Sequence, residues 1–310
     1  MTSYARAMVG HTGLKLRMVI AGSILFAFYA AVAGAVMLAF GANTTVLVLL
    51  LLGSLGFVGF QYKFGKWAAL RSVGAEDMPN EGQYREIHRA VEQLSRDMDI
   101  EKPRLMVADM GTPNAFAVGR KGAGTVVVSS ELIQLLDREE LEGVLAHELA
   151  HIKNRDVVVM LLGQSIASIV GIVVQFAVIF GGERNIASYF IAMIAGSIAQ
   201  MLVMIFVMAI SRYREYVADS DAAEYTNNPD AMARALERIQ QGAKRAQQAQ
   251  QASPGPRGRG RGRGRGQSSD GTPDEVAALC IFSGDRGILE TIFATHPPVE
   301  KRIERLRSRA

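Results

Sequence analysis

The sequence predicts an α-helical membrane protein with a mainly α-helical (α+β) cytoplasmic domain, which contains a small β-sheet with an edge strand. Three observations support this fold class. Four apolar runs, nearly free of charge, lie at residues 18–40, 44–60, 157–180 and 188–210. Strand-like segments separated by Gly, Pro and Lys lie between the second and third runs. A histidine motif with helical spacing comes directly before the third run.

The composition bounds the class of protein. The chain has 310 residues, 49% of them hydrophobic, and a formal net charge of +4 that comes largely from one arginine tract. The single cysteine, Cys280, excludes an intrachain disulfide and a cysteine-rich zinc site, which agrees with a reducing compartment. We expect no cleavable signal peptide, because the first apolar run is too long for an h-region.

Residues 1–61 are predicted to form a transmembrane hairpin. The run 18–40 holds 23 uncharged residues and is long enough to span a bilayer as a helix, and the run 44–60 returns after a tight turn. Basic residues flank both outer ends of the pair and none lies in the turn, so both ends should be cytoplasmic. A soluble apolar hairpin is the alternative, and two uncharged runs of this length disfavour it.

Residues 62–156 are predicted to be the first part of the cytoplasmic domain. A helix over 81–98 carries apolar residues on one face, and its His88 is expected to be an ordinary surface or boundary histidine. Strands are predicted at 104–108, 115–119 and 125–129, and a further helix begins near Ser130.

The motif H-E-x-x-H occupies residues 147–151. On a helix, His147 and His151 lie on the same face and can bind one Zn²⁺ ion, and Glu148 is placed to act on the attacking water. Asp137 and Glu140 read as a capping box at the start of this helix. The alternative is an amphipathic helix that carries two histidines by chance, which is improbable with only five histidines in the chain.

Residues 157–210 are predicted to form a second hairpin, which either spans the bilayer or enters it less deeply. Lys153 and Arg155 precede the pair of apolar runs, and Arg212 and Arg214 follow it. The positive-inside rule again places both outer ends in the cytoplasm. The two hairpins therefore agree, and the whole polar portion should lie on one side of the membrane.

Residues 211–310 are predicted to be the second part of the cytoplasmic domain. Its segment 240–274 is rich in Gln, Gly and Pro, with five arginines alternating with glycine between Arg257 and Arg265, and is expected to be disordered. We expect a flexible insertion; attraction to anionic lipid ranks second and RNA binding third, so no nucleic-acid partner is expected. The C-terminal segment contains His296-Pro297-Pro298 and an amphipathic, basic helix.

A catalytic zinc site usually has three protein ligands, so the motif needs one more. The candidates are acidic residues or His296. If straight helices continue the motif helix and the fourth apolar run, folding the chain about residue 183 places residue 151 opposite 215 and residue 147 opposite 219. This pairing predicts Glu215 as the third ligand and Asp219 as the residue that orients a histidine N–H. The alternative is a charge cluster that stops a transmembrane helix.

Together these segments resemble the HtpX-type membrane zinc endopeptidases, relatives of the CAAX prenyl endopeptidases. The resemblance rests on residues 147–151 followed by Asp156, a membrane hairpin, and the segment 211–219, which reads S-R-x-R-E-Y-x-A-D. It implies a zincin-like metalloprotease domain, one Zn²⁺ per chain held at His147, His151 and Glu215, and Glu148 as the catalytic base. It also implies a multi-pass protein of the bacterial inner membrane that cleaves misfolded or misassembled membrane proteins on the cytoplasmic side, in quality control and stress response.

The resemblance also suggests two further functional segments. His296 is the leading catalytic candidate for stabilising the oxyanion, because the family places a histidine there and two prolines would stiffen its backbone. The alternative is a loop histidine in water. Asn114, Ala115, Phe116 and Ala117 resemble the substrate-binding edge strand of the family, where the backbone pairs with an extended peptide. The alternative is a plain core strand after a turn. The arginine–glycine insertion departs from the family pattern.

Three functions compete at this stage. The leading one is a membrane-embedded endopeptidase whose partners are protein substrates, chiefly membrane proteins, and the lipid bilayer. A CAAX-type prenyl-protein endopeptidase is the second, although four spans are few for that group. The third is a non-catalytic membrane scaffold with structural zinc, which would need a fourth protein ligand, a role that Asp219 alone could fill.

Overall fold

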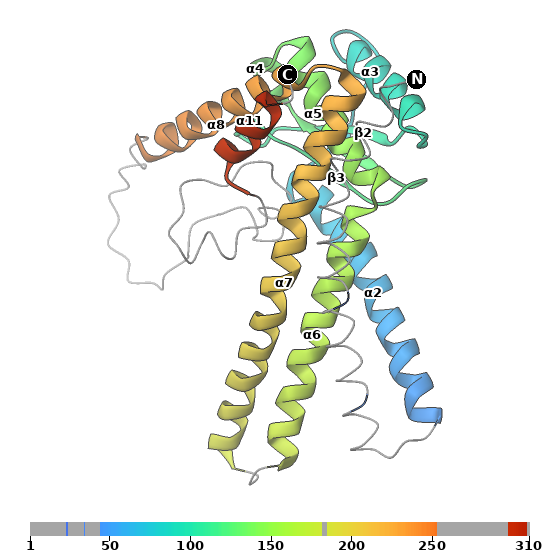
Figure 1. Cartoon of the computed structure of the whole chain (residues 1–310), viewed down its shortest axis with the longest axis vertical. Coiled ribbons are helices and arrows are strands. Elements are labelled where there is room, and N and C mark those ends of the chain that lie inside the picture. Colours follow the sequence, from blue (N-terminus) through green and yellow to red (C-terminus); the bar gives the residue numbers. More distant parts are fainter. Residues whose placement is uncertain (1–22, 24–33, 35–43, 182–184, 253–296, 309–310) are drawn as a thin grey trace, which may run out of the picture. The chain divides into compact units, whose positions relative to one another are not determined.

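The computed structural model describes residues 23, 34, 44–181, 185–252 and 297–308, and it divides the chain into two compact units (Figure 1). One unit comprises the described residues up to Gly65 and those within Arg155–Val217. The other comprises Lys66–Asn154 and residues 218–252 and 297–308. The predicted scheme of domains at 1–61, 62–156, 157–210 and 211–310 stays a prediction.

The first unit contains the apolar helices. They are α2 (Thr44–Ser72), whose first part belongs here, α6 (Asp156–Gly181) and α7 (Ile186–Thr226), whose last turns enter the second unit. Two described helices, α6 and α7, are long and apolar enough to cross a membrane. The predicted run 44–60 forms the start of α2, and the run 18–40 lies almost wholly outside the described residues.

Helices α6 and α7 run side by side along the length of α6 (Figure 1). Their contact is close because it is lined by glycine: a Cβ added at Gly196 would lie 2.6 Å from the carbonyl oxygen of Gly171. Gly163 likewise faces Val207, and an apolar cluster around Ala167 and Val207 fills the rest of the contact. Small residues therefore allow the two backbones to approach, as is common between membrane helices.

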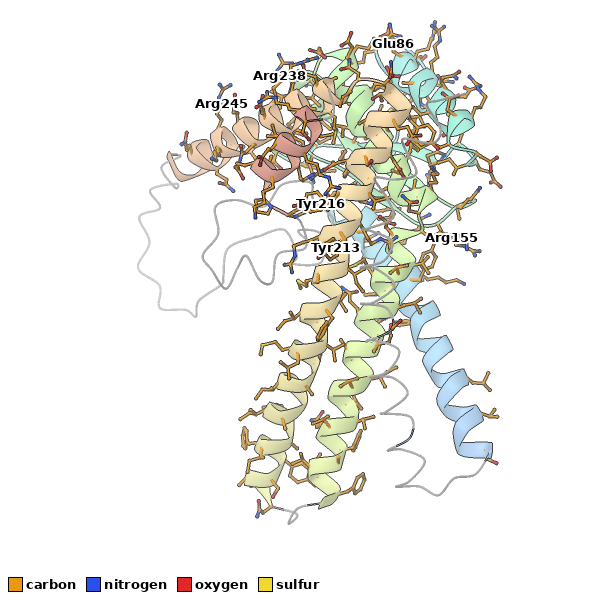
Figure 2. All side chains as sticks on the ribbon, in the orientation of Figure 1. Glu86, Arg155, Tyr213, Tyr216, Arg238 and Arg245 are labelled. Carbon is orange, nitrogen blue, oxygen red and sulfur yellow. The ribbon has the colours of Figure 1, made fainter. Side chains whose placement is uncertain are left out.

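The outward faces of this pair are apolar. Figure 2 shows that the ends of α6 and α7 next to their connection carry mainly carbon side chains. Large exposed hydrophobic side chains include Phe176, Phe180, Phe190, Ile194 and Leu202. At 1.5 Å per residue the 41 residues of α7 extend about 62 Å, roughly twice the hydrocarbon thickness of a bilayer. The whole of α7 is therefore longer than a bilayer is thick, and the charged residues from 211 onward follow its apolar part, residues 188–210.

The second unit is the α+β domain. Its helices are α3 (Tyr84–Asp97), α4 (Ser130–Leu135), α5 (Arg138–Lys153), α8 (Pro229–Ala252) and α11 (Val299–Arg307). Its strands are β1 (Glu76–Asp77), β2 (Arg104–Ala108), β3 (Ala115–Val118) and β4 (Thr125–Ser129). The three strands predicted from the sequence match β2, β3 and β4, and the expected C-terminal helix is α11. The fold class is thus confirmed.

The four strands form a mixed sheet in the order β1-β2-β4-β3. β2 pairs with β4 in parallel, whereas β1 and β3 pair antiparallel to their neighbours. β3 is thus one of the two outer strands of the described sheet, and β1 is the other. Alternate residues enter two clusters: one face packs with α3 and α5, and the other packs with Ala69 near the end of α2.

Helix α8 corrects one prediction. The segment 240–274 was expected to be disordered throughout, yet α8 continues to Ala252 and buries Ala243. Residues 240–252 are mainly Ala, Gln, Lys and Arg, which are good helix formers and extend a helix that is already packed. Residues 253–274, including the arginine–glycine tract, lie outside the described residues.

Candidate metal centre

Helix α5 presents the motif to the interior of the second unit. The helix begins with the predicted capping box: Asp137 accepts a hydrogen bond from the Glu140 backbone N–H, and the Glu140 side chain accepts one from the Asp137 N–H. His147 and Glu148 are buried, and His151 is half-buried. The capping box fixes where the helix begins, and the i, i+4 spacing then places both imidazoles on one face.

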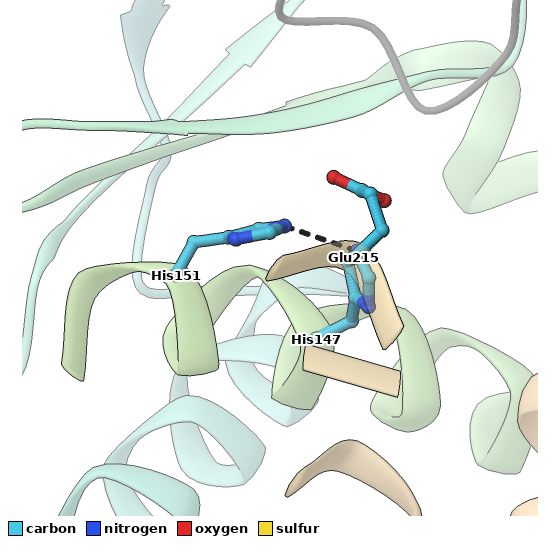
Figure 3. Close-up of side chains that lie close together, drawn as sticks. All are labelled: His147, His151 and Glu215. Carbon is cyan, nitrogen blue, oxygen red and sulfur yellow. Dashed lines mark hydrogen bonds between the residues drawn. The ribbon is translucent and has the colours of Figure 1, made fainter. Parts of the chain in front are cut away.

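The two imidazoles point their Nε2 atoms at one another. His147 Nε2 and His151 Nε2 lie 3.1 Å apart, and the rings are nearly perpendicular (Figure 3). Two nitrogens bound to one tetrahedral zinc at ordinary Zn–N lengths would lie about 3.3 Å apart. The separation of these two nitrogens therefore fits a shared metal ion.

Glu215 lies one turn before Asp219 on α7, and its carboxylate lies near the two imidazoles. One ligand atom each from His147, His151 and Glu215 lies within 4.8 Å of the others, and Figure 3 shows the three side chains converging. The Glu215 side chain is buried. Two imidazole nitrogens and one carboxylate oxygen form a donor set that catalytic zinc sites use, with a further position left for water or substrate.

Asp219 holds the other nitrogen of His147. His147 Nδ1 lies 3.0 Å from Asp219 Oδ1, and both side chains are buried. A carboxylate at this nitrogen favours the tautomer with a proton on Nδ1, which leaves the Nε2 lone pair for a metal. The predicted pairing of residue 147 with residue 219 is thus present in the structure.

Arg302 of α11 binds the same carboxylate from the other side. Its Nη2 donates to Asp219 Oδ1 at 2.6 Å and its Nε donates to Oδ2 at 2.8 Å. Burial raises the pKa of Asp219, but the charge of Arg302 and the hydrogen bonds from Arg302 and His147 outweigh burial and hold the pKa at about 2. Asp219 is therefore an anion at neutral pH, with both oxygens engaged.

Sequence reasoning missed Arg302. The guanidinium is 0% exposed, and its Nη2 lies 3.4 Å from His147 Nε2. The signal that could have found it is the spacing of Val299, Arg302, Ile303 and Leu306, which puts one arginine on the apolar face of an otherwise basic helix. A charge at a core position of a helix indicates a buried partner.

The connection between α5 and α6 differs from the expectation. The pairing argument assumed that the motif helix continues straight into the third apolar run, whereas α5 ends at Lys153 and α6 begins at Asp156. Asn154 caps α5, and Arg155 adopts a left-handed conformation with φ 57° that ends the helical path. Both metal-site pairs survive this break because α7 is one continuous helix through Glu215 and Asp219.

The other predicted site residues divide into two groups. His296 lies outside the described residues, and Pro298, two residues later, is the N-cap residue of α11. Asn114 and residues 115–117 lie at the start of β3 and are buried. The Asn114 carbonyl accepts from the Ser129 N–H at 2.8 Å, so this stretch pairs with β4 on one side and forms the outer edge on the other.

Comparisons with known proteins agree with this arrangement. The family described as Peptidase family M48 matches residues 81–310. The chain is 59% identical over 291 residues to a protein named Protease HtpX homolog from Halobacterium salinarum, covering 94% of this chain and 100% of that one. It is 36% identical over 275 residues to a protein of the same name from Aquifex aeolicus, covering 84% of each.

A solved structure shares the fold. The crystal structure of S. mikatae Ste24p superposes with a TM-score of 0.55 at 14% sequence identity, over 97% of this chain and 67% of that one. The family match covers both segments that bring the three candidate ligands together. The chain therefore belongs to peptidase family M48, in which it is a membrane metalloprotease of the HtpX type.

Proposed function

We propose that this protein is a zinc endopeptidase that cleaves misfolded or misassembled membrane proteins at the cytoplasmic surface of the plasma membrane, in quality control under stress. The observation that carries the enzymatic part is the convergence of His147, His151 and Glu215 beside Glu148. We propose one Zn²⁺ per chain, held by these two histidines and Glu215. When bound, zinc would act as a Lewis acid toward the scissile carbonyl and make nearby water more acidic.

Glu148 is the proposed catalytic base. It follows the first ligand directly on α5 and is buried, so its carboxylate is shielded from bulk solvent. We propose that Glu148 takes a proton from the attacking water and returns it to the leaving amine. His296 stays the candidate donor to the oxyanion.

Asp219 and Arg302 are proposed to keep His147 in its metal-binding tautomer. This assignment disfavours a closed structural zinc site, because Asp219, the candidate fourth ligand, already gives both oxygens to Arg302. The contacts of Asp219 with Arg302 therefore support a catalytic site over a structural zinc site in a scaffold protein.

β3 is the proposed substrate-binding strand, through Asn114, Ala115, Phe116 and Ala117. An outer strand can add an extended peptide through the backbone groups of its outer edge, and such pairing depends little on the side chains of the peptide. Binding of this kind would suit unfolded segments of many proteins, which supports quality control.

The cytoplasmic orientation is proposed from basic residues at the outer ends of both apolar hairpins. The resemblance supplies the bacterial inner membrane as the location. Cys280 is the single cysteine and allows a direct check. A membrane-impermeant maleimide should label it in inside-out vesicles and leave it unlabelled in right-side-out vesicles; the reverse pattern would contradict the orientation.

Proteolysis by the purified protein tests the enzymatic part. Wild-type protein in detergent should degrade casein or an unfolded membrane protein in a zinc-dependent way, and a chelator should stop it. Glu148→Gln should keep zinc and lower the rate by about 10²–10⁴-fold, because it removes the base but no ligand. Glu142→Gln, on the same helix, is the control and should keep the wild-type rate. Undiminished cleavage by Glu148→Gln would remove the mechanism.

A further inference from the structure

The segment that joins α5 to α6 ends in a buried carboxylate. Asp156 is the first residue of α6 and follows Arg155, whose left-handed backbone turns the chain into the new helix. Its side chain is buried. A carboxylate out of water needs a partner of opposite charge.

Arg214 of α7 is that partner. Arg214 Nη2 forms an ion pair with Asp156 Oδ1, and the guanidinium is as buried as the carboxylate. The pair lies at the end of the apolar cluster of α6 and α7 that includes Val159, Val207 and Ile210. Breaking such a pair leaves an uncompensated charge among apolar side chains, so its geometry is strongly held.

Both partners lie within five residues of a candidate metal ligand in the chain. Asp156 lies five residues after His151, and Arg214 immediately precedes Glu215. Successive residues of a helix project about 100° apart, so fixing the direction of Arg214 also fixes the direction of Glu215.

A second contact joins the same linker to α7. Asn154 Nδ2 donates to Asp221 Oδ2 at 3.0 Å. The linker 154–156 is therefore bound to α7 at residue 221 and at residue 214, and Glu215 lies between these two points along the helix.

We propose that Asp156 and Arg214 are positioning residues for the metal centre: their ion pair sets the rotation of α7 about its axis and so aims Glu215 at the metal. This inference rests on the proposed role of Glu215 as a ligand. It assigns no contact with substrate to either residue. It gives a role to a buried ion pair, and such a pair is by itself weak evidence of a gain in stability.

Zinc affinity separates positioning from stability. The experiment uses the full chain in detergent with Glu148→Gln in the background, which prevents self-cleavage. The dissociation constant for zinc is measured by competition with a chromogenic chelator, and helix content is followed by circular dichroism. Asp156→Asn should weaken zinc binding by about 10- to 100-fold while the helix content stays at the wild-type level.

Glu140→Gln is the matched control. It also removes one charge from a buried carboxylate in an ion pair, here with Arg238 at 2.5 Å, and it lies on α5 seven residues before His147. We expect its zinc affinity to stay within threefold of the background protein, although its thermal stability falls. Equal loss of zinc affinity in Asp156→Asn and Glu140→Gln would overturn the proposal, as would wild-type affinity in Asp156→Asn.

Exchange of the two charges provides a second test of the positioning role. Asp156→Arg combined with Arg214→Asp restores an ion pair in reverse and should recover zinc affinity to within about fivefold. A folded double variant that binds zinc as weakly as Asp156→Asn contradicts the positioning role. Different results would contradict the proposed function itself. These are a background protein that binds no zinc, or a Glu215→Ala variant that binds zinc with the affinity of the background protein.

Discussion

Asp219 of α7 and Arg302 of α11 lie 83 residues apart in the chain and form a buried bidentate ion pair. The two nitrogen–oxygen distances are 2.6 and 2.8 Å. Because Asp219 also contacts His147, the pair links the C-terminal helix to the first candidate ligand. The side chains of the metal centre therefore come from three helices, α5, α7 and α11.

Replacing Arg302 tests this link. Arg302→Met should lower the free energy of unfolding by about 3–5 kcal/mol, because it leaves the Asp219 carboxylate buried without its counter-charge. Zinc affinity should fall by about 10- to 100-fold, since His147 loses a firmly held partner. The measurements are unfolding in detergent micelles and chelator competition.

Arg307→Met is the control for Arg302→Met. Arg307 lies on the same helix, is half exposed and pairs with Glu237, so its loss should cost less than about 1 kcal/mol. If both variants have the same stability and zinc affinity, the ion pair of Arg302 with Asp219 does not support His147.

Replacing Glu215 tests the third ligand. Glu215→Ala should lose bound zinc, since two histidines alone leave the site short of one protein ligand. Elemental analysis of the purified protein gives the zinc content per chain. Glu224→Ala, an exposed glutamate on the same helix, should keep one zinc per chain. Full zinc content in Glu215→Ala would show that the predicted pairing of α5 with α7 does not supply the ligand.

The edge of β3 should bind substrate through backbone groups. Asn114 exchanges hydrogen bonds with Ser129, so alternation along an antiparallel pair directs the N–H of Ala117 away from β4. Ala117→Pro removes that donor and should raise KM about 2- to 10-fold with little change in kcat, as expected for one lost hydrogen bond. Ala117→Ser keeps the N–H and should retain the wild-type KM. Steady-state kinetics on a quenched peptide would contradict this assignment if Ala117→Pro left KM unaltered.

Glycine should be required where α6 and α7 meet. Gly196→Ala places a methyl group 2.6 Å from the Gly171 carbonyl oxygen, and because that atom is backbone the helices must separate. We expect a loss of about 1–3 kcal/mol, seen as a lower midpoint of thermal unfolding in detergent. Gly181→Ala meets nothing within 4 Å and should not lower the midpoint. Equal midpoints for the two variants would argue against close packing.

Local signals predicted much of the fold. The capping box of Asp137 and Glu140 depends on residues three apart, and the structure contains it. Strands β2, β3 and β4 follow from short, mainly apolar runs between turn residues. β1 has only two residues, Glu76 and Asp77, and both are exposed. No apolar pattern in the sequence identifies β1, because this strand is defined by its backbone pairing with β2.

The contacts of the site were predictable only where one continuous helix enforced them. Asp219 could be placed opposite His147 because α7 continues as one helix from the hairpin turn through residue 219. Arg302 could not be placed, because it lies 83 residues after Asp219 and on a different helix, so no continuous helix relates the two positions. Its partner is set by tertiary packing. The break at Arg155 was missed because a left-handed conformation at a non-glycine residue has no strong sequence signal.

The position of Arg302 has a consequence for the timing of synthesis. A ribosome makes this residue 155 positions after His147, which at ordinary elongation rates takes on the order of 10 s. During that interval the motif helix can already form, but Asp219 lacks its cation. The metal centre therefore stays incomplete until α11 has been made, because Arg302 of α11 completes the electrostatic environment of His147.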